Sequence, residues 1–124
     1  MADGNCIAQL GGWVGYRVDD WRQELRGSQS WLVLELAPQD DGGRICSGCD
    51  GPVAAIHDRT LRRIRDLPMF EHAVELLVPR LRLACPRCGP RLERLDWLDP
   101  HVRVTRRLAQ NVARLCAGTS VRHA

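Results

Sequence analysis

Four of the six cysteines in this 124-residue chain form two Cys-x-x-Cys pairs. Cys46 and Cys49 form the first pair, Cys85 and Cys88 form the second, and thirty-five residues lie between the pairs. Two residues between the sulfurs allow a tight turn to direct both thiolates at one ion, and four thiolates complete a tetrahedral shell. The spacing therefore predicts one four-thiolate site for Zn²⁺. A shell closed by four protein ligands leaves no position for water or substrate, so the metal is expected to be structural.

The compartment of the protein bears on whether these cysteines bind metal or form disulfides. Residues 1–10 have neither the basic start nor the apolar run of a secretory signal. The longest apolar stretches, such as residues 31–34, are too short to span a bilayer, and no membrane partner is expected. We therefore expect a reducing cytoplasmic location, which favours metal thiolates over disulfides.

The other cysteines and the histidines give no second metal site. Cys116 falls on the apolar face of a predicted helix and Cys6 lies near the N-terminus, so both are expected to be non-ligands. Surface positions or local hydrogen bonds are expected for the four histidines, which are His57, His72, His101 and His123.

Charge is distributed unevenly along the chain. Residues 1–45 contain four arginines and seven acidic residues, a net charge of −3, whereas residues 46–124 contain fourteen arginines and eight acidic residues, a net charge of +6. A basic region of this kind is typical of nucleic-acid-binding modules. All eighteen basic residues are arginine, which is also what a GC-rich genome produces, so the placement of the arginines matters more than their number.

The elements expected to position these residues make an α+β protein of three units. Residues 1–45 are predicted to form a β-hairpin, with strands at 13–18 and 31–36, a turn at 26–29 and an end at Pro38. Residues 46–100 are predicted to form a small zinc-ribbon-like β unit, and residues 101–124 the start of a helix-turn-helix.

Within the second unit, a short strand is expected at 53–57, a strand at 61–67, a turn at 66–70 and a return strand at 72–85. The apolar alternation in the return strand changes phase at Pro79, which predicts a bulge or an edge position. If the strands at 61–67 and 72–85 pair, the arginines at 63, 65, 80 and 82 could build one basic stripe.

The third unit begins with helical periodicity. Val104, Leu108, Val112 and Leu115 recur at steps of three and four residues, Thr105 is suited to an N-cap and Gly118 to a helix end. A second helix is predicted to start at Val121, where only four residues remain, so we expect the helix-turn-helix to be incomplete.

Three segments together resemble a known family. Residues 61–68 (LRRIRDLP), 78–83 (VPRLRL) and 85–89 (CPRCG) are similar to the N-terminal zinc-binding region of bacterial insertion-sequence transposases of the ISL-three family, and residues 97–124 resemble the start of the helix-turn-helix that follows. One departure is Asp50, which follows Cys49 where a glycine is more usual in the family.

The resemblance implies binding of double-stranded DNA at transposon ends by a protein of the bacterial nucleoid. The family's catalytic domain, which holds divalent metal with acidic residues, has no counterpart in this chain, so the chain is not expected to be an enzyme by itself. The arginines chosen as DNA-binding candidates are Arg62, Arg63, Arg65, Arg80, Arg82, Arg103, Arg106 and Arg107.

Two other readings remain open from the residues alone. A zinc-clipped protein-interaction or regulatory module would carry the same cysteine pairs. An iron-binding electron carrier of the rubredoxin kind also ends its knuckles in Cys-Pro-x-Cys-Gly, but such carriers resemble acidic domains with aromatic cores, and this chain has one Phe and one Tyr. Visible absorption distinguishes ferric tetrathiolate from zinc.

Overall fold

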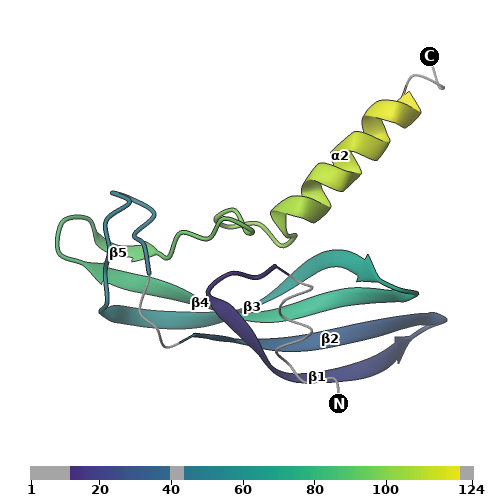
Figure 1. The fold of residues 1–124 in the computed structure, drawn as a ribbon, viewed down its shortest axis with the longest axis horizontal. Helices are drawn as coiled ribbons and strands as arrows, with labels where there is room; N and C mark the ends of the chain where they lie inside the picture. The colour runs from purple at the N-terminus through teal and green to yellow at the C-terminus, as the bar shows by residue number, and fades with distance from the viewer. Residues whose placement is uncertain (1–11, 40–43, 121–124) are drawn as a thin grey trace.

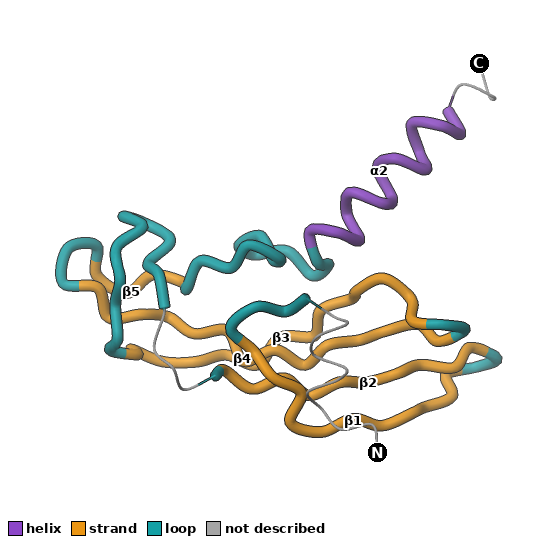
Figure 2. Tube along the Cα trace, viewed as in Figure 1, coloured by secondary structure: helices purple, strands orange, loops and turns teal. Residues whose placement is uncertain are grey.

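The computed structural model describes residues 12–39 and 44–120, which are mostly β-sheet with one helix (Figure 1). The elements are β1 (Tyr16–Arg26), β2 (Gln29–Pro38), β3 (Ile56–Met69), β4 (His72–Cys85), β5 (Gly89–Leu92) and α2 (Arg106–Ser120). They form one sheet of order β1-β2-β4-β3, to which β5 adds by pairing with β4. Figure 2 shows the elongated sheet with the helix directed away from it. This architecture fits the predicted β unit with a four-cysteine site.

The N-terminal hairpin has the predicted turn but a different first strand. Gly27 occupies the turn with φ of 64°, and β2 ends at Pro38 as expected. The first strand was predicted at 13–18, but β1 runs from Tyr16 to Arg26, so the prediction was right only for residues 16–18. Residues 20–26 are largely charged, and they pair with β2 as the edge strand of the sheet. Charged side chains are common on such edges, where they discourage pairing with other chains.

The hairpin and the cysteine-bearing region share the same sheet. β2 pairs in parallel with β4, and Leu34 lies opposite Leu76 in this register. The sheet is thus continuous across the predicted boundary at residue 45. The division into units 1–45, 46–100 and 101–124 remains a prediction.

β3 and β4 form a long antiparallel hairpin. β4 has the predicted bounds, whereas β3 runs without a break from Ile56 to Met69. The separate strand at 53–57 and the turn at 66–70 were therefore wrong, and only Phe70 and Glu71 form the turn. Pro68 is accommodated inside β3 because the ladder changes register between Asp66 and Met69.

The alternation of apolar residues in β4 shifts at Pro79 because the strand buries one face before this residue and the opposite face after it. Val74, Leu76 and Val78 face one hydrophobic core, and Leu81, Leu83 and Cys85 face a second core on the opposite side of the sheet. The pairing with β3 continues through Pro79, so the predicted bulge is absent.

Pro79 nevertheless occupies an edge-like position. Pairing of β4 with β2 ends at Leu77, and pairing with β5 begins at Arg82. In this gap the Tyr16 hydroxyl donates to the Pro79 carbonyl at 3.0 Å. Because β4 pairs with neither β2 nor β5 at this point, the N–H that proline lacks is not needed for a hydrogen bond on that side of the strand.

The segment between β5 and α2 covers the first core. Leu95, Trp97 and Leu98 are buried in it, and the Trp97 indole donates to the Val14 carbonyl at 3.1 Å. Tyr16 packs edge-on against Trp97 with ring centroids 5.6 Å apart. This covering segment brings the chain from the cysteine end of the sheet to the start of the helix.

α2 begins as predicted but ends later. Thr105 is the N-cap, since its hydroxyl accepts from the Leu108 amide at 3.4 Å. The expected end at Gly118 was wrong, because the helix extends to Ser120. The second helix predicted from Val121 lies outside the described residues, as does His123. No helix in residues 12–39 and 44–120 is long and apolar enough to cross a membrane.

Candidate metal centre and nucleic-acid interface

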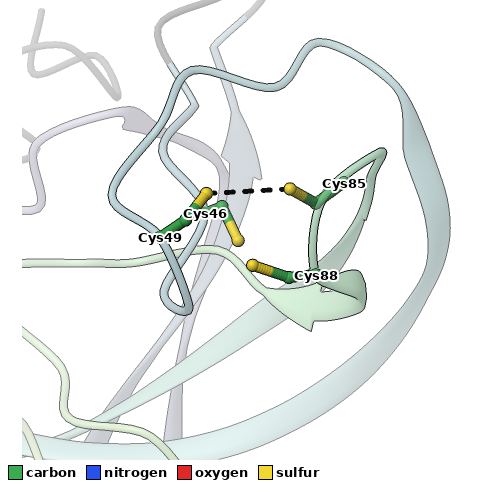
Figure 3. Close-up of side chains that lie close together, drawn as sticks. All are labelled: Cys46, Cys49, Cys85 and Cys88. Carbon is green, nitrogen blue, oxygen red and sulfur yellow. Dashed lines mark hydrogen bonds between the residues drawn. The ribbon is translucent and has the colours of Figure 1, made fainter.

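The two Cys-x-x-Cys pairs meet at one end of the sheet. The sulfurs of Cys46, Cys49, Cys85 and Cys88 all lie within 4.8 Å of one another, and Cys49 Sγ is 3.7 Å from Cys85 Sγ. Figure 3 shows the four side chains converging from the first knuckle and from the turn between β4 and β5. Tetrahedral zinc with Zn–S bonds of about 2.3 Å requires sulfurs about 3.8 Å apart. The geometry therefore suits one metal ion bound by four thiolates.

The first knuckle is a tight turn stabilised by its own backbone. The Cys46 amide donates to the Gly51 carbonyl and the Asp50 amide donates to the Cys46 carbonyl, both at 2.9 Å. The Gly48 amide points at Cys46 Sγ, 3.3 Å away. Asp50 has φ of 58°, so the residue after Cys49 adopts the left-handed conformation in which the family usually has glycine. The substitution noted in the sequence thus preserves the turn.

The second knuckle has the same conformation with a glycine. Gly89 follows Cys88 with φ of 76° and pairs with Cys85 as β5 begins. The amides of Arg87 and Cys88 donate to Cys85 and lower the pKa of its thiol to about 6. Burial and the neighbouring sulfurs raise the pKa of Cys88 to about 12. Four thiolates cannot coexist at this distance without a cation, so metal binding must displace protons.

Arg87 lies over the metal centre and was not singled out in the sequence. Hydrogen bonds and charge interactions with Cys49 and Cys85 raise the pKa of its guanidinium. A Cβ added to Gly51 would lie 2.0 Å from Arg87 Nη2, so this glycine leaves the room for the guanidinium. Because Zn²⁺ with four thiolates would carry two negative charges, Arg87 would offset part of the charge of such a cluster. Its position between the two cysteines of the second pair is the sequence feature from which this role of Arg87 could have been predicted.

Backbone hydrogen bonds also join the first knuckle to the chain that follows the second. The Ser47 amide donates to the Leu92 carbonyl at 3.1 Å, and the Arg94 amide donates to the Ile45 carbonyl at 2.8 Å. Behind the sulfurs, Val53, Leu81 and Leu83 form the apolar part of the second core. The site is thus built from a loop that pairs with the chain leaving β5.

The three histidines in the described residues lie at the surface or in a local hydrogen bond, as predicted, and outside the group of four cysteines. His57 and His101 are exposed, and His72 Nδ1 is 2.8 Å from the Ser30 hydroxyl. Cys6 and the side chain of Cys116 lie outside the residues and side chains that the structure describes.

A buried carboxylate joins the sheet to the helix. Asp66 in β3 accepts from the Trp13 indole at 2.8 Å, from the Thr105 hydroxyl at 2.6 Å and from Arg107 Nε at 2.7 Å. Burial raises the pKa of Asp66, but hydrogen bonds from Arg107, Thr105 and other donors outweigh it and lower the pKa overall. No local sequence pattern indicates this role for Asp66, because its partners lie about forty or more residues away in the chain.

The predicted four-arginine stripe is contradicted by the strand register. Arg63 lies opposite Leu77 and Arg65 opposite Glu75, whereas Arg80 lies opposite Thr60 and Arg82 opposite Asp58. Cross-strand partners share a face, so Arg63 and Arg65 lie on one face of the sheet and Arg80 and Arg82 on the other. The prediction failed because a hairpin register cannot be fixed from alternation alone.

The eight DNA candidates fall into two groups. Four are occupied: Arg82 pairs with Asp58, Arg106 with Asp99, Arg107 with Asp66, and Arg80 is buried against the Glu93 carbonyl. The other four are exposed and have no carboxylate within salt-bridge distance among the described residues. They are Arg62, Arg63, Arg65 and Arg103.

Comparison with known proteins connects these features to transposases. Residues 43–89 match the family described as the zinc-finger of transposase IS204/IS1001/IS1096/IS1165. The chain is 41% identical over 124 residues to the transposase for insertion sequence element IS1001 of Bordetella parapertussis. The match covers 98% of this chain and 30% of that protein, so the chain spans less than a third of the length of its relative. No solved structure matches the chain.

Proposed function

The cysteine-bearing region of this chain belongs to the zinc-finger family of the transposases IS204, IS1001, IS1096 and IS1165, and from this premise we propose that the chain binds double-stranded DNA at transposon ends. Cys46, Cys49, Cys85 and Cys88 hold one structural Zn²⁺ in this proposal. The chain contributes recognition and no catalytic step, and it acts at the nucleoid in the bacterial cytoplasm.

The observation that carries the proposal is the set of exposed arginines without carboxylate partners. Arg62, Arg63 and Arg65 lie in β3, with Arg62 on one face and the other two on the opposite face. Arg103 lies shortly before α2, and the whole region carries net positive charge. Arginine is suited to phosphate because its planar donors match phosphate oxygens. Phosphate contacts of this kind supply affinity and orientation without reading the base sequence.

The metal supports this surface from a distance. It fixes the turn between β4 and β5, from which the covering segment runs to Thr105 and α2. Since the shell is closed by protein sulfurs, the ion provides folding energy and takes no part in chemistry on DNA.

The proposal is tested by DNA binding of the zinc-loaded chain as a function of salt. Fluorescence anisotropy compares a duplex of the element's inverted repeat with a shuffled duplex between about 50 and 200 mM salt. Contacts to roughly two to four phosphates give a slope of log K against log salt of about −2 to −4. We expect weak binding with similar affinity for both duplexes. Absence of binding to either duplex at low salt contradicts the proposal and favours a protein-interaction module.

The identity of the metal has a separate test. Purified protein should contain one zinc per chain and be colourless, and four thiols should react only after a chelator is added. Cobalt substitution should give the visible absorption of a tetrahedral thiolate site. Visible absorption of the untreated protein with stoichiometric iron would instead identify a rubredoxin-like centre.

A further inference from the structure

A cavity of about 250 Å³ lies between the β3–β4 hairpin and the segment that covers the first core. Its polar wall is formed by Thr60, Arg62, Arg80 and Arg82 from the strands, with Asp99 and His101 from the covering segment. The strand residues share one face because Thr60 lies opposite Arg80, and Arg62 and Arg82 follow at steps of two. The remaining wall is aliphatic. Three arginines thus line one partly open cavity.

The charges around this cavity do not balance within the protein. Asp58 pairs with Arg82 and Asp99 pairs with Arg106, so both carboxylates are already engaged. Arg62 is exposed and has no ion pair in the described part of the chain. Arg62 therefore gives the cavity a positive charge without an ion pair, and Arg80 adds a second guanidinium that lies near the Glu93 carboxylate without hydrogen-bonding to it.

Arg80 has a buried hydrogen-bond donor without an acceptor in the described part of the chain. Its residue is only 5% exposed, and Nη2 donates to the Glu93 carbonyl at 3.1 Å. Nη1 is buried and has no hydrogen-bond partner. The Glu93 carboxylate accepts from the Tyr16 hydroxyl at 3.0 Å and not from Arg80. Buried donors are nearly always satisfied, so an unsatisfied guanidinium N–H beside a cavity points to an acceptor that the chain itself lacks.

The donor set defines the chemistry of that acceptor. Two guanidinium groups, with the Thr60 hydroxyl and the His101 imidazole on the same wall, offer several N–H and O–H donors to one site. A tetrahedral oxyanion presents several acceptor oxygens and negative charge, and arginine binds phosphate through paired hydrogen bonds. The volume is several times the share of about 30 Å³ that a water occupies in the liquid, so a phosphate group and waters fit.

We propose that this cavity binds one phosphate group, and that in the DNA complex the group is a backbone phosphate. The inference rests on the proposed function and sharpens it, because it assigns the cavity side of the β3–β4 hairpin as the side that meets DNA. Of the exposed arginines of β3, Arg62 then contacts the duplex directly, whereas Arg63 and Arg65, on the opposite face, add to the positive potential around it without contacting it.

Adjacent arginines of β3 provide a matched pair of variants. Arg62→Gln removes a charge from the cavity, and Arg63→Gln removes the same charge from an equally exposed position on the other face. Arg80 is left unchanged, since replacement of a buried residue would confound folding with binding. Both variants keep the four cysteines and are studied as zinc-loaded full chains.

The first arm titrates inorganic phosphate at constant ionic strength, with chloride as the reference, and follows backbone and arginine side-chain NMR signals. We expect saturable shifts at Thr60, Arg62, Arg80 and His101 in the unchanged chain and in Arg63→Gln, and none in Arg62→Gln. Equal shifts in both variants, or no shifts in the unchanged chain, would overturn the proposed site.

The second arm measures duplex DNA affinity at low salt. Arg62→Gln should weaken binding about tenfold and lower the magnitude of the salt slope by about one, whereas Arg63→Gln should change affinity less than about twofold. DNA should also abolish the phosphate-induced shifts by competition.

The outcomes separate the site from the function. If the chain binds DNA and the two variants lose affinity equally, the phosphate site is wrong and DNA binding stands. If no form binds DNA but phosphate still shifts the cavity signals, the DNA role is wrong and the site serves a free phosphate compound. If neither ligand binds, both proposals fail.

Discussion

At the scale of single residues, the two knuckles have the same left-handed backbone conformation after the second cysteine, but with different residues in that position. Asp50 and Gly89 each follow the second cysteine of a pair, and their φ angles are 58° and 76°. The left-handed conformation is unfavourable for residues with a Cβ, and aspartate tolerates it better than most because its short side chain can bond locally. Asp50 therefore occupies in the first knuckle the backbone conformation that Gly89 occupies in the second.

Replacement of Asp50 tests this interpretation. Asp50→Gly and Asp50→Ala both remove the exposed ion pair with Arg94, which contributes little. They differ in the cost of positive φ, so we expect the glycine variant to be more stable than the alanine variant by about 1 kcal/mol. Urea unfolding at fixed zinc concentration measures the difference. Equal stability of the two variants would mean that the turn is not held in the left-handed conformation.

At the scale of elements, Asp66 determines how α2 joins the sheet. It binds Trp13 from the N-terminal segment and both Thr105 and Arg107 from the helix start. Backbone bonds reinforce the joint, with the Arg65 amide donating to the Arg103 carbonyl at 2.8 Å and the Thr105 amide to the Arg65 carbonyl at 2.9 Å. The helix contacts the sheet mainly through β3, so this joint sets the helix direction.

Asp66→Asn should destabilise the protein by about 3 kcal/mol at neutral pH, because it leaves the Arg107 guanidinium beside a buried group without charge. Asp99→Asn is the control, because Asp99 pairs at the surface with Arg106, the neighbour of Arg107 in the first turn of α2. This substitution should cost less than about 1 kcal/mol. Chemical denaturation of both variants provides the comparison. Similar losses for the two would show that burial of Asp66 is unimportant.

The same variant has a defined pH dependence. The pKa of Asp66 is lowered in the folded protein, so its stabilising effect is complete above the ordinary aspartate pKa of about 4 and is lost as pH falls through the lower folded pKa. The stability difference between the unchanged chain and Asp66→Asn should therefore be constant from neutral pH to about pH 5 and shrink below it. Protonation of the cysteines affects both proteins equally, so it does not alter this difference.

At the scale of the whole molecule, the sheet carries two cores of unequal size on opposite faces. Among the described residues, the first has twelve buried members and the second has five, which include Cys46 and Cys85 of the candidate metal site. Because the second apolar cluster is so small, we infer that a metal bound by the four cysteines stabilises this end of the sheet, while hydrophobic packing stabilises the other.

Removal of zinc by a chelator should open the cysteine end selectively. We expect amide exchange to accelerate by about 100-fold or more at residues 45–53 and 85–94, while β2 amides near Leu34 remain protected. DNA affinity should fall in parallel, since the covering segment begins at the opened end. Uniform loss of protection along the sheet would show that the metal stabilises both cores together.

Features that depend on neighbours in the chain could be predicted from the amino-acid sequence. The cysteine spacing predicted which four sulfurs lie together, the apolar run predicted the bounds of β4, and Thr105 predicted the start of the helix, because knuckles, strands and caps are specified by a few adjacent residues. The family followed from ordered motifs of the same local kind.

The faces and partners of those elements depend on tertiary packing. The charged residues 20–26 form part of a strand because their backbone pairs with β2. The change of phase at Pro79 corresponds to a switch from the first core to the second. The eight arginines divided into paired and unpaired groups because carboxylates such as Asp58 and Asp66 approach them across the register of β3 and β4. Such pairings join residues far apart in the chain, and they depend on register and packing that local pattern does not specify.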